Sequence, residues 1–134
     1  MTAYLVDTNH LSVLVTEEHP LRQRVIGQLQ SHDSFAIAAP ILNEILFGFL
    51  MTPRAKKNLA AWGKLNDIFG FYEIDRRDAE RAANLQADLR RRGWQLHTVD
   101  ALIAAVALRY DLTLLTKDRD FSTVVGLNTE NWLI

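Results

Sequence analysis

Hydrophobic residues along the chain form four short runs, separated by longer stretches in which they recur at helical spacing. The runs predict strands at Ala3–Val6, Phe35–Ala38, Phe71–Ile74 and Leu112–Leu115. The first and last runs are almost continuously apolar, which is typical of strands covered on both faces. The closing segment "GLNTENWLI" predicts a further short edge strand near Trp132.

The stretches between these runs predict amphipathic or buried helices. We expect them at Pro20–Gln30, Pro40–Leu50, Pro53–Phe69, Asp75–Arg92 and Thr98–Tyr110. Asp75 suits the N-cap of its helix, and Gly93 suits the position just after the helix end. The last of these helices is apolar on nearly all sides, which is typical of a buried helix. Such alternation of strands and helices predicts an α/β fold with a mainly parallel central sheet.

Length and composition narrow the class of protein. The 134 residues contain no repeat or linker and predict a single domain that spans residues 1–134. Fifteen basic and sixteen acidic residues give a formal charge of -1, which neither requires nor excludes a nucleic-acid partner. The absence of cysteine excludes disulfides and thiolate sites. We expect a cytoplasmic protein without a membrane partner, because the sequence has no signal peptide and no long apolar run.

Acidic residues occupy the positions where a ligand would bind. In an open α/β sheet, ligands bind beyond the carboxyl ends of the strands. Asp7 directly follows the first predicted strand, and Asp118 lies three residues after the last one. Glu44 and Asp100 are the acids of two otherwise apolar helices. Asp120 is a close neighbour of Asp118, and we expect one of the two to face the site.

Each of these acids also has a purely structural explanation. Asp7 suits the cap of a following helix, with Thr8 and Asn9 in capping positions beside it. A carboxylate in the first helical turn, such as Asp100, gains about 0.3–1 kcal/mol from the exposed amides. Glu44 would be an ordinary solvated helix acid. Against this reading, the helix after Asp100 is so apolar that its first turn should open into a cleft.

Carboxylates held close together point to a metal ion. They cannot all stay ionised unless a cation compensates their charge. Oxygen ligands without histidine or cysteine suit Mg²⁺ or Mn²⁺. Such an ion lowers the pKa of a bound water and stabilises displacement at a phosphodiester. No single segment has a metal-ligand spacing, so the site must be assembled from distant segments.

Four segments in this order and spacing resemble the PIN-domain ribonucleases: "LVDTN", "NEILFG", "DALIAAVAL" and "LLTKDRDF". Within that family the chain is most similar to the VapC toxins of bacterial toxin–antitoxin pairs, over essentially its whole length. The resemblance implies a three-layer α/β/α sandwich and a metal-dependent endoribonuclease that cleaves RNA. It also implies inhibition by a cognate VapB-like antitoxin, and a homodimer or a larger toxin–antitoxin assembly.

The resemblance also assigns roles to individual residues. The matching acids, expected to be catalytic, are Asp7, Glu44, Asp100 and Asp118. Asp7 and Asp100 would hold Mg²⁺ or Mn²⁺, and the other two would lie in or near the coordination shell. Thr8 and Thr116 match hydroxyl positions that support such a site. The fourth acid is open, because Asp120 could substitute for Asp118.

Basic and apolar side chains supply candidate surfaces for RNA and protein partners. The basic clusters are Arg54, Lys56 and Lys57; Arg76, Arg77, Arg81, Arg90, Arg91 and Arg92; and Lys117 and Arg119. They either bind RNA phosphates or form solvated helix faces. Trp94 could stack a base, or pack in the core or an interface. The apolar candidates for interfaces, or for the core, are Leu46, Phe47, Phe49, Leu50, Trp62 and Phe69.

Two other classes of function compete with this reading. A phosphoacceptor signalling domain would account for Thr116 and Lys117, but it needs paired acids after the first strand and an acceptor aspartate after a central strand. Here "LVDT" has one acid and "FAIAAP" has none. A non-catalytic PIN-like module for RNA binding or scaffolding is the second alternative. It gives no physical reason to keep four mutually repelling carboxylates.

Overall fold

A parallel sheet of five strands forms the centre of the molecule, whose computed structural model describes residues 1–134. The strands are β1 Ala3–Val6, β2 Ser34–Ala38, β3 Gly70–Tyr72, β4 Thr113–Leu115 and β5 Thr129–Glu130. Their order across the sheet is β3-β2-β1-β4-β5, and every neighbouring pair is parallel. The expected parallel sheet and the short edge strand near the C-terminus are therefore confirmed.

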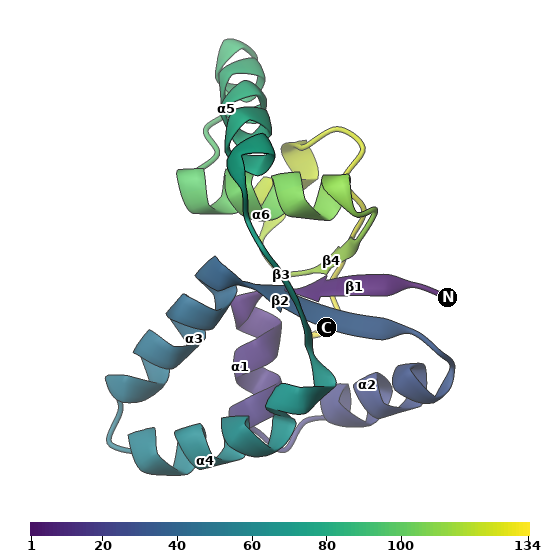
Figure 1. The fold of residues 1–134 in the computed structure, drawn as a ribbon, viewed down its shortest axis with the longest axis vertical. Helices are drawn as coiled ribbons and strands as arrows, with labels where there is room; N and C mark the ends of the chain where they lie inside the picture. Colours follow the sequence, from purple (N-terminus) through teal and green to yellow (C-terminus); the bar gives the residue numbers. More distant parts are fainter.

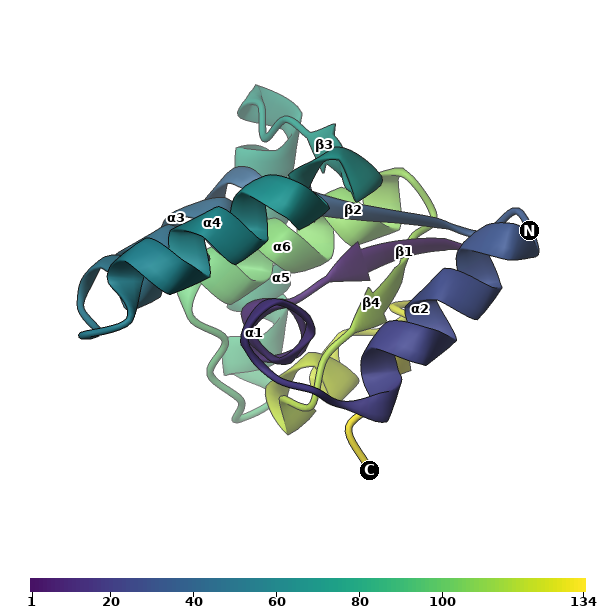
Figure 2. The same ribbon diagram turned by 90° about the horizontal axis from the view of Figure 1, so that it is seen from below.

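Six helices cover the two faces of this sheet. They are α1 Thr8–Thr16, α2 Pro20–Gln30, α3 Ala39–Leu50, α4 Ala55–Leu65, α5 Arg76–Arg91 and α6 Thr98–Arg109. Figure 1 shows α5 and α6 above the sheet and the other four helices below it. In Figure 2, α1, α2 and α4 lie in front of the strands. The three-layer α/β/α sandwich is confirmed, and no helix is both long and apolar enough to cross a membrane.

Three elements differ from the prediction by more than one residue at an end. Helix α1, which the pattern did not delimit, begins directly after Asp7. Strand β3 covers Gly70–Tyr72 instead of Phe71–Ile74, because its only partner, β2, ends at Ala38 and offers no further ladder positions. The helix expected over Pro53–Phe69 is shorter: α4 ends at Leu65 and a 3₁₀ helix follows.

The core joins the central strands to the helices on both faces. The strand β1 is buried from Tyr4 onward, all of β4 is buried, and α6 is buried along most of its length. Each large side chain buried in this way stabilises the fold by about 1.5–3 kcal/mol. Near the C-terminus, Trp132 packs edge-on against Tyr4 and Phe35 at ring separations of 5.0 and 5.9 Å. This packing fixes the chain end against the centre of the sheet.

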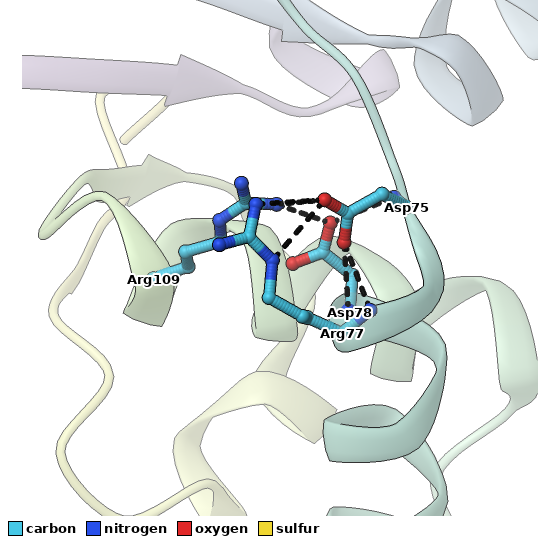
Figure 3. Close-up of polar contacts among 4 residues, drawn as sticks. All are labelled: Asp75, Arg77, Asp78 and Arg109. Atoms are coloured by element: carbon cyan, nitrogen blue, oxygen red, sulfur yellow. Dashed lines mark hydrogen bonds and ion pairs between the residues drawn. The ribbon is translucent and has the colours of Figure 1, made fainter.

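An ion-pair network joins the start of α5 to the end of α6 (Figure 3). Asp75 accepts from the amides of Arg77 and Asp78, and the Asp78 side chain accepts from the Asp75 amide, which completes a capping box. The expected N-cap role of Asp75 is confirmed. Arg109 lies 3.0 Å from both carboxylates, and Asp78 is only 1% exposed. The two helices are thus fixed together at the end remote from Asp100.

Loss of the Arg109 guanidinium should destabilise this helix pair. Arg109→Gln leaves the buried Asp78 carboxylate without its cation, and breaking such a pair costs about 3 kcal/mol. Arg76→Gln removes only the exposed pair with Glu80 and should cost less than about 1 kcal/mol. Urea denaturation of both variants measures the difference. Equal stabilities would contradict a structural role for the network.

Candidate functional site

Asp7 lies where β1 passes directly into α1 at the carboxyl edge of the sheet. Its amide donates to the Leu115 carbonyl at 2.9 Å, which extends the pairing of β1 with β4 by one residue. Its Oδ1 accepts from the Thr8 amide at 2.8 Å, so that Asp7 itself is the N-cap of α1. Thr8 and Asn9, expected as caps, lie inside the first turn. Asp7 is 8% exposed, and these backbone and capping hydrogen bonds hold it at the sheet edge.

Thr116 supports Asp7 from the neighbouring strand. Its hydroxyl donates to Asp7 Oδ2 at 2.7 Å and accepts from the Asp118 amide at 3.0 Å. The Asn9 side chain also donates to Asp7 Oδ2, at 3.3 Å. Asp7 Oδ1 accepts only the Thr8 amide, so it keeps a lone pair for a ligand. The structure thus places Thr116 where the sequence predicted a supporting hydroxyl.

Thr8 makes the corresponding link toward α3. Its hydroxyl donates to Glu44 Oε2 at 3.2 Å, which joins the start of α1 to the exposed Glu44 side chain. Asp118 caps the 3₁₀ helix Arg119–Thr123 by accepting from the Asp120 amide at 2.9 Å. Each of these two acids keeps one carboxylate oxygen without a protein donor.

The four predicted acids lie in one electrostatic environment. Asp100 is half-buried in the first turn of α6, and its pKa is raised to about 6, with burial as the largest cause. The charges of Asp118, Asp7 and Glu44 contribute to this rise, in that order of effect. Burial also raises the pKa of Asp7, assisted by the charge of Asp118 and opposed by the hydrogen bond from Thr116. The fold therefore brings these acids together from four distant segments.

This set of donors fits a hydrated divalent cation. No three acidic or histidine side chains converge closely enough to enclose an ion alone. Mg²⁺, however, keeps several waters and is commonly held by one or two carboxylates. The donors are hard oxygens, and a cation would relieve the repulsion that adds to the effect of burial on the pKa of Asp100. The site matches such an ion in charge and chemistry, and water would complete its coordination.

Sequence reasoning missed a buried histidine behind this site. His10 is fully buried, and its Nε2 accepts from the Trp132 amide at 3.0 Å. Its Nδ1 must then carry the proton, and it donates to Asn9 Oδ1 at 2.6 Å. Asn9 in turn donates to Asp7. The available signal was a polar residue on the apolar face of α1, four positions before Leu14, but its partners are distant in sequence.

A groove of about 400 Å³ runs from Glu44 along α1, α3 and α4. Gly48, Arg54 and Lys57 line it, so part of the first basic cluster lies near the acids.

The apolar residues expected at an interface fall into buried and exposed groups. Phe49 and Trp62 are buried in the core and cannot form an interface, whereas the side chains of Phe47 and Leu50 are exposed. Leu46 and Phe69 pack partly buried against the core.

Known proteins resemble this chain over nearly its whole length. The family model described as PIN domain matches residues 4–127. The tRNA(fMet)-specific endonuclease VapC of Shigella flexneri is 26% identical over 133 residues, which cover 98% of this chain and 99% of the relative. Ribonuclease VapC2 of Haemophilus influenzae is 24% identical and covers 99% of this chain and 100% of its own.

Two solved structures have the same fold. One is the VapBC2 complex from Rickettsia felis, bound to a DNA fragment from the promoter of the two proteins. It has a TM-score of 0.87 and is 20% identical, and the match covers 98% of this chain and 99% of that chain. The other is DNA-bound VapBC from Salmonella typhimurium, with a TM-score of 0.82 and 23% identity over the same shares of the two chains. At identities of 20% and 23%, the similarity shows that the chains share a fold.

The buried His10 should make folding stability sensitive to acid. Burial lowers the pKa of His10 from 6.5 to about 4, and the charge of Lys117 acts in the same direction. Below pH 6.5 the unfolded chain binds a proton that the folded chain does not. Stability is therefore full above pH 6.5 and falls toward pH 4, by roughly 3 kcal/mol from this group.

Urea denaturation of the wild type and His10→Gln from pH 7 to 4 isolates this effect. The difference in unfolding free energy between the two proteins should shrink by that amount as the pH falls. The raised pKa values of Asp7 and Asp100 act in the opposite direction, but both proteins share them. The exposed-site variant His32→Asn should follow the wild-type profile. A constant difference between wild type and His10→Gln would contradict the buried neutral imidazole.

Proposed function

Because this chain belongs to the PIN domain family, we propose that it is a metal-dependent endoribonuclease and the toxin of a type II toxin–antitoxin pair. The observation that carries the proposal is the gathering of the acids by hydrogen bonds: Thr116 bonds both Asp7 and the Asp118 amide, and Thr8, next to Asp7, bonds Glu44. The charges of these three acids also raise the pKa of Asp100. Relatives that align over nearly the whole chain bear the names of VapC ribonucleases. Membership of this family removes the phosphoacceptor alternative.

In the proposed site, Asp7 and Asp100 hold Mg²⁺ or Mn²⁺, with Glu44 and Asp118 in or near the coordination shell. Such an ion lowers the pKa of a water and offsets the charge that develops on the phosphate. Thr116 keeps Asp7 Oδ2 occupied, so that Oδ1 is the oxygen available for binding. The pairing of β1 with β4 prevents this carboxylate from swinging away.

In this proposal either Glu44 or Asp118 orients the attacking water. Glu44 Oε1 and Asp118 Oδ2 have no protein donor, whereas the other oxygen of each accepts one hydrogen bond. Either free oxygen can therefore accept a proton or a hydrogen bond from water. Asp118 is preferred to Asp120 as the fourth acid, because the charge of Asp118 acts on both Asp7 and Asp100.

Basic residues around the acids would hold the RNA phosphates on either side of the cut. Arg54 and Lys57 line the groove that begins at Glu44, and the exposed Lys117 and Arg119 flank Asp118. Cations at these positions neutralise phosphates without reading the base sequence.

The protein partner proposed for this chain is a VapB-like antitoxin. Solved structures with the same fold are complexes titled VapBC. The exposed Phe47 and Leu50 of α3, followed by the exposed Met51, offer apolar area for protein contact beside the groove. We extend the proposal to a homodimer or a larger toxin–antitoxin assembly, which sedimentation of the purified chain would test.

Removal of one site carboxylate should abolish RNA cleavage while the fold persists. Asp7→Asn and Asp100→Asn each keep the side-chain shape but lose a charge, and each should lower the cleavage rate more than about 100-fold. The exposed-site variant Asp67→Asn is the charge-matched control and should cut normally. Incubation of total RNA with Mg²⁺ or Mn²⁺, with EDTA in parallel, provides the measurement.

Three outcomes of that assay are decisive. A folded Asp7→Asn protein that cuts at the wild-type rate would refute the site. Wild-type protein that binds RNA but cuts it with neither ion would favour the non-catalytic scaffold. Loss of activity in Asp120→Asn, but not in Asp118→Asn, would reassign the fourth acid.

Metal binding should lower the raised pKa of Asp100. With the site free of metal, the carboxyl carbon of Asp100 should titrate near pH 6 by NMR. Because a proton and the cation compete for this carboxylate, saturating Mg²⁺ should move the titration to lower pH. By the same competition, Mg²⁺ affinity should weaken about tenfold per pH unit below 6. An Asp100 titration that Mg²⁺ leaves unchanged would contradict its role as a ligand.

A further inference from the structure

A hollow of about 440 Å³ lies beside the end of α5, outside the acidic site. It is lined by the last turns of that helix and the segment that leads to α6: Gln86, Arg90, Gly93, Trp94, Gln95 and Leu96. Figure 1 shows this connecting segment turning back alongside α5 to reach α6. Trp94 is 56% exposed, whereas Trp62 and Trp132 are 7% and 5% exposed. The structure thus excludes a core role for Trp94.

The backbone holds Trp94 rigidly in this exposed position. Gly93 has a φ of +86°, and its amide donates to the Arg90 carbonyl at 3.0 Å. The Trp94 amide donates to the Leu89 carbonyl at 2.9 Å, which completes a Schellman motif at the end of α5. A large aromatic side chain on a fixed backbone offers contact area at a low entropic cost.

The hollow is tied directly to the helix that carries Asp100. The Gln86 side chain donates to the Leu96 carbonyl at 3.1 Å and to the Thr98 hydroxyl at 3.3 Å. Thr98 begins α6, and Asp100 lies in the same first turn. Trp94 and Asp100 are six residues apart, so their Cα atoms are separated by at most about 22 Å. A few nucleotides of RNA can span that distance.

The charges around the hollow suit a nucleic acid. Arg91 lies 2.9 Å from Asp88, but the exposed Arg90 and Arg92 take part in no ion pair. Unpaired guanidinium groups beside an exposed indole can bind a phosphate and a stacked base together. The side chain of Gln95 adds a hydrogen-bond donor and acceptor for a base edge.

We propose that Trp94 stacks an unpaired nucleobase of the RNA a few nucleotides from the scissile phosphate, while Arg90 binds the adjoining phosphate. The position of the cut in this proposal rests on the proposed ribonuclease function. Binding of the base to Trp94 does not depend on that function, because none of the four acids lines the hollow. Trp94 and Arg90 are binding residues in this scheme and take no part in the chemistry.

Tryptophan fluorescence in EDTA tests the stacking without any cleavage. Single-stranded hexaribonucleotides of A, C, G or U are titrated into the protein, and an abasic ribose-phosphate hexamer provides the same charge without bases. Stacking on the one exposed indole should quench emission with the base-containing strands and not with the abasic strand. Trp94→Ala should remove the quenching and weaken binding roughly five- to 100-fold, measured by polarisation of labelled RNA.

Matched variants separate stacking from charge. Trp94→Phe keeps an aromatic face and should retain most of the affinity. Arg90→Gln should weaken binding of both kinds of strand, whereas Lys64→Gln, which removes one charge from the exposed face of α4, should not. Ile26→Ala removes an apolar side chain of α2 that is 42% exposed, and it should leave binding unchanged.

The outcomes distinguish this proposal from the proposed function. Equal quenching by the abasic strand, or unchanged RNA affinity in Trp94→Ala, would overturn the stacking subsite. So would a Trp94→Ala variant that binds RNA normally but no longer associates with itself in sedimentation, because Trp94 would then be a protein contact. If any of these results is found and the wild-type protein still cleaves RNA with Mg²⁺, only the stacking subsite is overturned and the ribonuclease proposal stands. Base-dependent quenching without cleavage supports the subsite and contradicts the ribonuclease.

Discussion

The hydrogen bond from the Thr116 hydroxyl to Asp7 Oδ2, 2.7 Å long, joins the carboxyl ends of the two central strands β1 and β4. Both residues are buried, Asp7 at 8% and Thr116 at 4% exposure, so little water reaches this bond. The same hydroxyl accepts from the Asp118 amide, and one threonine therefore orients two of the four acids. Parallel pairing of β1 with β4 makes this possible, because it brings residues 109 positions apart to the same edge of the sheet.

The site concentrates negative charge that the fold alone does not neutralise. Burial is the largest cause of the raised pKa of Asp100, and the charges of three other carboxylates add to it. Elsewhere the same chain pairs its buried acid closely, as Arg109 does with Asp78. In contrast, Asp7 and Asp100 have no basic partner, and Arg54 and Arg90 take part in no ion pair. This distribution supports the proposal of a bound cation and of RNA phosphates.

Rigidity around Asp7 comes from both ends of the chain. Strand β1 carries the carboxylate, and the C-terminal segment reaches it through the Trp132 amide, His10 and Asn9. The aromatic packing of Trp132 against β1 and β2 keeps this path in place. Such buried polar chains cost free energy unless every member is satisfied, and here each donor in the path has an acceptor. Distant parts of the fold thus determine the direction in which one carboxylate points.

The sequence by itself determined the class of fold, the positions of the four acids and the cap at Asp75, because these follow from local periodicity and from short motifs. It placed the end of β3 at Ile74, two residues too late, and it left the burial of Phe49 and Trp62 and the place of Trp94 undecided. Strand length depends on a partner strand, and burial depends on which helix packs opposite. His10 was missed for the same reason, since its partner Trp132 is 122 residues away. Only the tertiary structure brings such residues within hydrogen-bonding distance, and that distance decides their chemistry.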